Sequence, residues 1–482
     1  MNDLSFFVRA SSTLPPEHLW ANLAEGSASA WPVLEHCGRL KVGETVIFSL
    51  LHPDGSAVRS SGRIARIQPG RGITVHQETP WTGRIQFSLQ AKEAGSIVTV
   101  HVQVGSDCLP WFLSGGITLT PANGERTGPR IGLLVPLSGA AGIVGRAIVN
   151  AATMAIDELN DGGAFGFGSA ELVVADERTN ATTSLQLFER LVQSERCDVV
   201  VASVPSASMA LIRPAALRRG TLLLSAALSE HNDVGRNVFQ FGETPLDQLT
   251  SSVPGIMHSS AASNWFILGS DYVWPRSIGA VAQELIKYHR GTVAGIHYQA
   301  LGSDNFSDVI ARLAASDADL ILSSLVGVDA VMFQRAFHEA GLRSRFRTLA
   351  TNFDESILDH TGRDVAEGIW STQDYFMPAL ADEMDATAQR YRARFGDIAP
   401  RLSSMAKAVF DTITLYAQAV QVAKTVDPDA VGAAIRAGGA GDQRLLKRHG
   451  GEHLPTGVAE VTAGGFRPIE LPGVVRTSAG GN

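Results

Sequence analysis

The stretch that decides the fold is residues 265–280, WFILGSDYVWPRSIGA. An apolar run ends at a Gly-Ser-Asp turn, two aromatic residues follow, and Pro275 stands where a helix can begin. A continuous apolar run of this kind indicates a strand that is buried on both faces of a parallel sheet. Tyr272 and Trp274 therefore fall just beyond the carboxyl end of a predicted strand, where the ligand clefts of α/β proteins lie.

The same alternation of apolar runs and helical spacing continues in both directions from this stretch. Upstream, the runs RIGLLVPLSG, AELVVAD, CDVVVAS and GTLLLSA are separated by segments of helical periodicity. Downstream, GTVAGIHY, ADLILSSLVG and FRTLAT follow the same rule. Repeated strand–helix–strand units predict right-handed crossovers and doubly wound sheets. The sequence therefore predicts an α/β fold of two lobes, with a cleft between the carboxyl ends of their strands.

The first 105 residues follow a different period. In IVTVHVQV, residues 97–104, alternate valines share one face of a strand, and RIQFSLQA alternates in the same way. The helical segment 14–37 precedes most of these strands, so we expect a small α+β domain with helices inserted after its first strand. The expected boundaries are 1–120 for this domain, 121–129 for a linker and 130–478 for the α/β domain. Within the latter, lobe 1 is expected over about 130–248 plus part of 376–425, and lobe 2 over about 249–375 plus the C-terminal part.

Composition favours a globular protein that binds a small ligand or another protein. The 482 residues are 45% hydrophobic and 18% charged, with a net charge of −8 and no dense Lys/Arg block, so we expect no direct binding of nucleic acid. Three scattered cysteines, Cys37, Cys108 and Cys197, indicate buried thiols and neither a disulfide framework nor a metal site. No signal-peptide pattern and no apolar run of about 18 residues is present, which predicts a cytoplasmic protein without membrane insertion.

Strings typical of enzymes carry little weight in this chain. HGGEH, residues 449–453, fits a zinc-peptidase pattern, but its two glycines and the following Leu-Pro disfavour the helix that such a site needs. SSMAK and GSDN occur in the reverse of the order found in penicillin-binding enzymes. We therefore expect no catalytic residues, no metal and no cofactor in the α/β domain. His76 and His101 are the histidines on predicted strands of the N-terminal domain, and an enzyme built there is the remaining alternative.

The α/β part resembles a known family once its motifs are taken together. Gly-Ser-x-Tyr followed by an aromatic residue and Pro-Arg, together with RGTVAGIHY, ADLILSSLVG, DVAEGIW and GEHLPTGVAEVTAGGFRPI, resembles type I periplasmic-binding-protein folds of the amide, urea and branched-chain amino-acid branch. The resemblance covers residues 129–475 in family order. It implies a non-catalytic binding module in which a small polar ligand closes two lobes. Within that branch it is most similar to cytoplasmic amide sensors that restrain a transcription antiterminator.

The resemblance also implies where the ligand binds. In lobe 1 it places Ser203, Val204 and Ser206 in a loop that opens a helix, and Ser225 and Ala227 in the next loop. Helix capping is the structural alternative for Ser206. In lobe 2 it places Tyr272, Val326, Phe353 and Glu355 at the cleft. A helix N-terminus is an equally good reading of Asp354 and Glu355. For Trp274 we favour a place in the core over a place in the cleft.

The chain departs from the family pattern at two positions, and one alternative function remains for the α/β part. Amide sensors carry tyrosines near Val204 and Ser225, and this chain has neither, so its pocket is expected to be wider. An alternative function is the substrate-binding component of a transporter for amides, urea or branched-chain amino acids. The implied partners are the small polar ligand and a response-regulator or antiterminator protein, and a homodimer is left open.

The N-terminal domain resembles a second family. VRASSTLPPEHLWANL, LKVGETVIFSL, GRIARIQPGRGITVHQETPW and the final hairpin resemble the START-like, helix-grip superfamily over residues 3–105. That family closes an apolar cavity with a long C-terminal helix. Residues 106–128 are too short and too rich in Gly and Pro to form it. The resemblance implies a domain that binds or converts a hydrophobic small molecule, with its closing helix missing.

Overall fold

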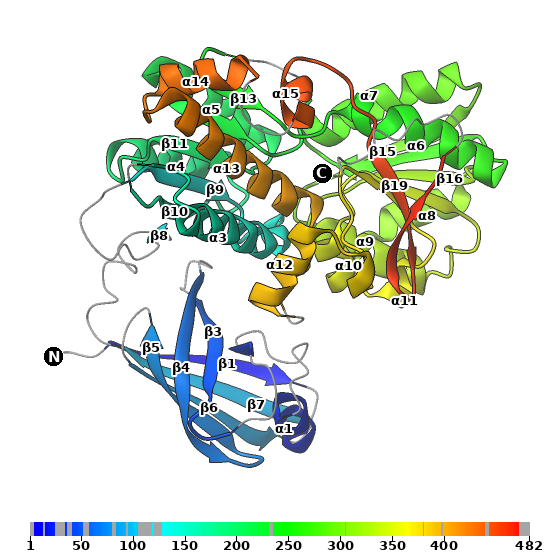
Figure 1. Cartoon of the computed structure of the whole chain (residues 1–482). Helices are drawn as coiled ribbons and strands as arrows, with labels where there is room; N and C mark the ends of the chain where they lie inside the picture. Colours follow the sequence, from blue (N-terminus) through cyan, green and yellow to red (C-terminus); the bar gives the residue numbers. More distant parts are fainter. Residues whose placement is uncertain are drawn as a thin grey trace. The chain divides into compact units, whose positions relative to one another are not determined.

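The computed structural model describes most of the chain. The described residues are 4–12, 15–24, 34–35, 41–51, 57–79, 83–92, 95–104, 117–119, 128–166, 168–230, 235–303, 305–378, 380–396, 399–438 and 443–471. The chain divides into two compact units, Met1–Thr118 with Phe395–Ala399, and Leu119–Arg394 with Pro400–Asn482. Each unit has its own sheets (Figure 1).

The N-terminal unit is built on a seven-stranded sheet in the order β1-β7-β6-β5-β4-β3-β2. Neighbouring strands are antiparallel, and one described helix, α1, follows β1, as the sequence predicts. The bounds are β1 (Leu4–Ser12), α1 (Pro16–Ala24), β2 (Leu34–Glu35), β3 (Thr45–Leu51), β4 (Ala57–Gln68), β5 (Gly72–Thr79), β6 (Gly83–Lys92) and β7 (Gly95–Val104).

Period two in the sequence becomes two different faces of this sheet. Along β6, Ile85, Phe87 and Leu89 are buried while the residues between them are not. Val75 on β5 is also fully buried, and its neighbour His76 is exposed, so His76 does not point into the apolar face. The segment 105–116, which carries Cys108 and most of the expected closing region, lies outside the described residues, as does Cys37.

Lobe 1 of the larger unit contains a six-stranded sheet in the order β13-β12-β11-β9-β10-β8. Strands β9 to β13 are parallel, and their apolar residues are buried on both faces. The strands are β8 (Ile117–Leu119), β9 (Arg130–Val135), β10 (Glu171–Asp176), β11 (Val199–Ala202), β12 (Leu222–Ser225) and β13 (Val238–Gln240). The helices are η3 (Gly142–Val144), α3 (Gly145–Asp161), α4 (Ala181–Gln193), α5 (Ser206–Arg219), α12 (Ala386–Phe395), α13 (Ser404–Ala423), α14 (Pro428–Arg436) and α15 (Gln443–His449).

Lobe 2 contains a seven-stranded sheet in the order β15-β14-β16-β17-β18-β19-β20. β14 to β18 are parallel, and β19 and β20 add an antiparallel hairpin. The strands are β14 (Asn264–Ser270), β15 (Thr292–Gln299), β16 (Leu320–Ser324), β17 (Arg347–Ala350), β18 (Trp370–Gln373), β19 (Gly457–Thr462) and β20 (Gly465–Ile469). The helices are α6 (Pro245–Ser260), α7 (Val273–Tyr288), α8 (Ser307–Ala315), α9 (Val328–Glu339), α10 (Glu355–Thr361), α11 (Arg363–Ala366) and η4 (Ala381–Glu383).

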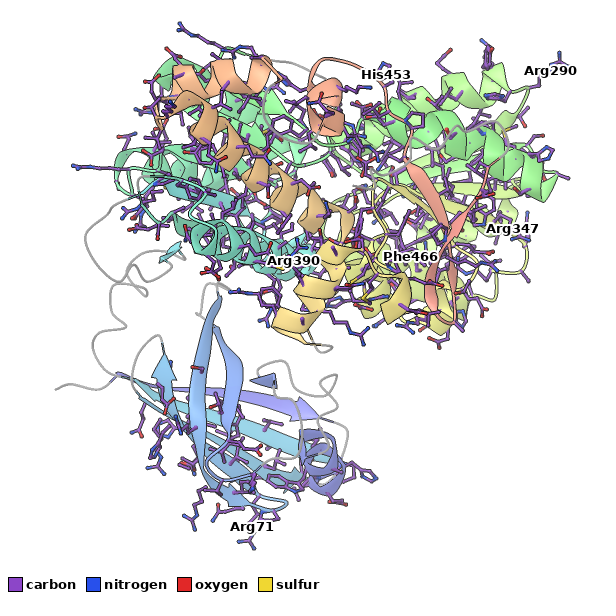
Figure 2. All side chains as sticks on the ribbon, viewed as in Figure 1. Arg71, Arg290, Arg347, Arg390, His453 and Phe466 are labelled. Carbon is purple, nitrogen blue, oxygen red and sulfur yellow. The ribbon has the colours of Figure 1, made fainter. Side chains whose placement is uncertain are left out.

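Each face of the lobe 2 sheet packs into its own apolar cluster. Trp274 is 1% exposed and packs with Trp265 and Ile278 on one face, the core position favoured for it from the sequence. It also lines the cavity described below, so the two interpretations of Trp274 hold together. The other face holds Phe353, Phe333 and Phe466, and Phe466 is labelled on β20 in Figure 2. Among the described residues no helix is long and apolar enough to cross a membrane. Cys197 is buried and is not part of a disulfide among the described residues.

The chain crosses between the two lobes three times. The first crossing joins β13 to α6, the second leaves β18 toward α12, and the third joins α15 to β19. Lobe 1 therefore includes α14 and α15 as well as the expected return helices, because α14 and α15 pack against β12 and β13. These crossings form the hinge on which the cleft depends.

Candidate ligand-binding cleft

A cavity of about 60 Å³ lies between the two lobes, at the carboxyl ends of their strands. A buried water needs roughly 10–15 Å³ by a comparable measure, so the cavity suits a small molecule. The lining residues are Pro136, Ala141, Val144, Ser203, Val204, Pro205, Ser206, Ala227, Leu228, Tyr272, Trp274, Val326, Gly327, Asn352, Ile357 and Met405. Most of them directly follow β9, β11, β12, β14, β16 or β17, because parallel strands bring their carboxyl ends to one edge.

The structure brings together six of the nine site residues expected from the sequence. They are Ser203, Val204, Ser206, Ala227, Tyr272 and Val326. The sequence interpretation therefore located both lobe 1 loops and two of the lobe 2 strand ends.

Three expected site residues lie outside the cavity lining. Ser225 is 1% exposed within β12, one residue before the loop, and its carbonyl accepts from the Phe241 N–H at 2.9 Å. Phe353 is 1% exposed and belongs to the lobe 2 core, 6.5 Å from Phe466 between ring centroids. Glu355 is buried, and its Oε1 accepts from the Met377 N–H at 2.7 Å. After β17 it is Asn352, one residue before Phe353, that reaches the cavity.

Asp354 and Glu355 serve the start of α10. Asp354 is the N-cap, and its Oδ1 accepts from the Ile357 N–H at 3.0 Å, which is the helix-terminus reading considered for this pair. Burial, and then the charge of Asp354, raise the pKa of Glu355 to about 8. Burial also raises the pKa of Asp354 to about 6. Neither group is placed to hold a ligand cation in the cavity.

The amino end of α5 presents free donors at the cavity. Pro205 is the N-cap and Ser206 the first helical residue, so Ser206 does not cap the helix. The Pro205 carbonyl accepts from the N–H groups of Ser208 and Met209 at 2.9 and 3.0 Å. The N–H groups of Ser206 and Ala207 therefore have no acceptor within the helix, and they carry the positive end of its dipole.

Three buried polar atoms of the lining lack hydrogen-bond partners among the described residues. They are the Oγ of Ser203, whose residue is 3% exposed, the Nε1 of Trp274 and the Nδ2 of Asn352. A buried polar atom without a partner costs free energy, on the order of 1–3 kcal/mol, unless a ligand or water satisfies it. Ser203 belongs to lobe 1, and Trp274 and Asn352 belong to lobe 2, so a single ligand held from both sides would bridge the cleft.

The environment of Tyr272 favours its neutral hydroxyl. Burial raises the pKa of its hydroxyl, and the carboxylates of Glu230 and Asp329 raise it further. Asp329 itself accepts from the Gly302 N–H at 3.0 Å and from the Ser270 Oγ at 3.3 Å, and burial raises its pKa to about 6. Tyr272 therefore offers the cavity a neutral hydroxyl and an apolar ring.

The remaining walls are apolar. Val144, Val204, Leu228, Trp274, Val326, Ile357 and Met405 surround the polar groups, and the described lining contains no charged side chain. A ligand with a hydrocarbon body and one oxygen-bearing head fits this distribution. A ligand as polar as urea would leave most of these walls in contact with polar atoms.

The two lobes meet at one edge of this cavity. The Val328 N–H of lobe 2 donates to the Ala140 carbonyl of lobe 1 at 2.9 Å. Gly327 has a φ of +58°, and a Cβ there would lie 1.9 Å from the same carbonyl oxygen, so this approach requires glycine. Ile143 of η3 packs against the lobe 2 core. The structure therefore shows the cleft in a closed arrangement.

Sequence reasoning missed the lining residues that do not lie in the quoted loops. Pro136 follows β9 directly, so the rule on strand ends could have found it, and the same rule points to Asn352. Met405 lies in the first turn of α13, which returns from the second crossing, and no local pattern marks it.

Comparisons with known proteins agree with this architecture. Residues 129–449 match the family model described as periplasmic binding protein. A solute-binding protein of Rhodopseudomonas palustris, solved with benzoate, superposes with a TM-score of 0.61 at 19% identity, covering 71% of this chain and 96% of its own. A leucine-binding protein of Thermotoga maritima gives 0.61 at 16% identity, with coverages of 71% and 98%.

A branched-chain amino-acid binding protein of Streptococcus pneumoniae, solved with isoleucine, gives a TM-score of 0.60 at 17% identity, with coverages of 70% and 98%. At these identities the likeness concerns the fold alone. The family match, which spans two thirds of the sequence, carries the assignment: this chain belongs to the periplasmic binding protein family.

Proposed function

We propose that this protein binds a small molecule with an apolar body and an oxygen-bearing head. The two lobes close around this ligand, and the closure is the conformational response of the protein to binding. The observation that carries the proposal is the set of unpartnered buried groups, Ser203 Oγ, Trp274 Nε1 and Asn352 Nδ2, among apolar walls. The N–H groups at the start of α5 and the Tyr272 hydroxyl are further donors at the same cavity. All of these groups can donate a hydrogen bond to an oxygen atom of the ligand. Carboxylates with hydrocarbon bodies fit this arrangement better than short amides or urea.

The structural neighbours support this class of ligand. Those solved with benzoate and with isoleucine hold molecules that combine a carboxylate with an apolar body. The described lining has no carboxylate to pair with an ammonium group. Glu230 lies outside the lining, and its charge contributes to the raised pKa of Tyr272. Benzoate-like acids are therefore the first ligands to test, and amino acids the second.

The experiment is a thermal-shift screen of the full-length protein with benzoate, 4-hydroxybenzoate, L-isoleucine, acetamide and urea. A ligand that binds only the native state raises the melting temperature by mass action. At a concentration a hundredfold above its Kd, it increases the free energy of unfolding by about 2.7 kcal/mol. Ser203→Ala should weaken the shift. Ser225→Ala, a buried serine at a neighbouring strand end but outside the lining, is the matched control and should leave it unchanged.

Other results would reject the proposal. A shift with acetamide or urea alone would assign the cavity to amides and contradict the apolar-body reading. A shift that survives Ser203→Ala together with Tyr272→Phe would place the ligand elsewhere in the molecule.

We also propose that the protein acts as a cytoplasmic sensor that controls a regulatory partner, with the transporter receptor as the alternative. The fusion of the binding domain to a separate N-terminal unit supports the sensor role, because the fused unit can pass closure on to a regulator. Hydrogen exchange of the full chain separates the two roles. Ligand-dependent protection within residues 57–104 is expected for a sensor, whereas protection confined to the two lobes would favour the receptor.

The N-terminal unit keeps its own candidate function. We propose that it is a START-like domain, because its helix follows β1 and its strand order places β1 beside β7. Its buried face of Val75, Ile85 and Phe87 would contact a hydrophobic ligand. Binding of a fluorescent aromatic or lipid-like probe, weakened by Phe87→Ser, is the expected result. Binding unaffected by that change would reject this use of the sheet.

A further inference from the structure

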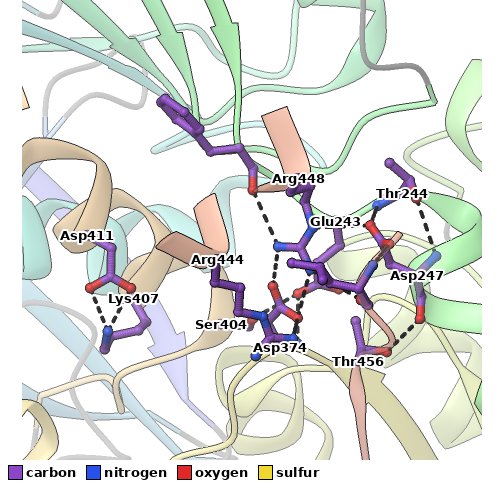
Figure 3. A network of polar contacts seen from close by, with 12 residues as sticks. Glu243, Thr244, Asp247, Asp374, Ser404, Lys407, Asp411, Arg444, Arg448 and Thr456 are labelled. Carbon is purple, nitrogen blue, oxygen red and sulfur yellow. Dashed lines mark hydrogen bonds and ion pairs between the residues drawn. The ribbon is translucent and has the colours of Figure 1, made fainter. Parts of the chain in front are cut away.

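The hinge contains a group of charged residues that we name the hinge cluster: Glu243, Asp247, Asp374, Arg444 and Arg448 (Figure 3). The cluster draws on all three crossings. Glu243 lies on the first, Asp374 begins the second, and Arg448 is two residues before the third. Arg448 is 1% exposed and Asp247 is also 1% exposed, so the central pair is removed from solvent.

Arg448 binds two of the acids directly. Its Nε donates to Asp247 Oδ2 at 3.1 Å, its Nη2 donates to Asp374 Oδ1 at 3.1 Å, and its Nη1 pairs with Asp374 Oδ2. Asp247 also accepts from the Leu454 N–H at 2.7 Å on the third crossing. These contacts hold the crossings together, but none of them touches the cavity.

Glu243 extends the cluster in a different direction. Its Oε1 accepts from the Asp374 N–H at 2.8 Å and from the Ser404 Oγ at 3.0 Å. Its Oε2 accepts from the Gln248 Nε2 at 2.6 Å. Three donors on one buried carboxylate match its ionised form, and the remaining burial cost raises the pKa of Glu243 to about 7.

Gln248 connects this carboxylate to the strand ends of lobe 2. Its Nε2 also lies 3.0 Å from the Thr351 carbonyl and 3.3 Å from the Thr372 carbonyl. Thr351 immediately precedes Asn352, which lines the cavity. The Gln248 Oε1 is buried without a partner among the described residues, so the orientation of this amide is determined by Glu243 and by the two carbonyls.

We propose that Glu243 is a positioning residue for the binding cleft. Through Gln248 it connects the three crossings of the hinge to the segment after β17 that carries Asn352. The proposal rests on the proposed function for the use of the cleft, but the coupling itself exists without ligand. A change at Glu243 therefore alters the cavity although Glu243 does not line it.

Glu243→Gln tests the coupling with almost no change in shape. The new Oε1 can still accept from Asp374 and Ser404, but the new amide nitrogen would face the Gln248 Nε2, donor against donor. Gln248 must then turn its amide and withdraw its donor from Thr351 and Thr372. The substitution thus breaks the link to the cavity and spares the other bonds of Glu243.

The readout is hydrogen exchange of the ligand-free, full-length protein. We expect peptides covering residues 348–357 to exchange about tenfold faster in Glu243→Gln, the effect of one lost hydrogen bond at the base of that segment. Peptides from α3 and α13, which pack together in lobe 1, should exchange as in the unsubstituted protein. Glu339→Gln, at an exposed carboxylate on α9, is the matched control and should change neither.

A second variant protects the test against poor folding of the first. Gln248→Met keeps the length of the side chain and removes its donors, so it should reproduce the same local acceleration. Unchanged exchange at 348–357 in both variants, or equal acceleration throughout both lobes, would overturn the proposal. Because no ligand is present, this result is independent of whether the ligand screen succeeds.

Discussion

The cavity and the hinge lie in the same domain but use opposite chemistry. The described cavity lining has no charged side chain and contains polar atoms without partners. The hinge cluster gathers three acids and two arginines, and its members contact one another at hydrogen-bond distance. The difference indicates that charge specifies how the chain crosses between lobes, while the cavity leaves its hydrogen bonds for a ligand.

The largest expected effect comes from breaking the hinge side of this comparison. Arg448→Met removes the buried arginine that pairs with Asp247, and it removes one of the two arginines that pair with Asp374. Removing one partner of a buried ion pair leaves the other charge uncompensated and costs roughly 3–5 kcal/mol, so the unfolding midpoint in urea should fall strongly. Lys447→Met, at the preceding and half-exposed position, is the control and should cost less than about 1 kcal/mol. Equal effects would show that burial of the cluster is not what matters.

The next effect concerns closure at the edge of the cavity. Gly327→Ala places a Cβ against the Ala140 carbonyl at a positive φ, so the closed arrangement becomes unfavourable. We expect at least a tenfold loss of ligand affinity, with a smaller loss of stability, about 1–2 kcal/mol for the strained backbone. Isothermal titration and urea unfolding measure the two. Gly302→Ala, also at a positive φ but with open space around its Cβ position, is the control for backbone strain alone.

A third prediction uses the pH dependence of stability. Burial raises the pKa of Glu355 to about 8, of Glu243 to about 7 and of Asp354 to about 6. The folded protein then binds more protons than the unfolded chain between roughly pH 4 and pH 8, so the free energy of unfolding falls as pH rises through this window. The change attributable to Glu355 should amount to a few kcal/mol. Glu355→Gln should flatten the curve, and an unaltered slope would contradict the assignment.

The smallest expected effect tests the role of Asp354 as the N-cap of α10. Asp354→Ala removes an N-cap and should destabilise the protein by about 1 kcal/mol, whereas Asp354→Asn should cost less because asparagine also caps helices. Neither change should alter ligand affinity, since Asp354 does not line the cavity. A loss of affinity with either variant would return Asp354 to the binding site.

Sequence patterns predicted the architecture because each strand and each helix has a hydrophobic pattern within its own short segment. The apolar runs around Val201 and Ile267 became strands buried on both faces, and the alternation through Phe87 became the half-buried sheet of the N-terminal unit. The strand-end rule located Tyr272 for the same reason, and the family resemblance located Ser203. These features depend on the alternation of apolar and polar residues or on continuous apolar runs of about five residues. Both patterns can be recognised in a single sequence.

The remaining features depend on register or on contacts distant in sequence. A shift of one residue separates Asn352, which reaches the cavity, from Phe353, which enters the core, and a strand end does not show which of the two will turn inward. Met405 reaches the cavity from α13, and the hinge cluster joins Asp247 to Arg448 across 201 residues. No local pattern encodes such meetings.

The number of crossings has a practical consequence. Because the number of crossings is odd, the first and last strands of the binding domain lie in different lobes. β9 lies in lobe 1, and β20, the last described strand, lies in lobe 2. A tag placed before β9 and another placed after β20 would thus report on different lobes. Energy transfer between two such fluorophores would register opening and closing in a living cell, without any label inside the cleft.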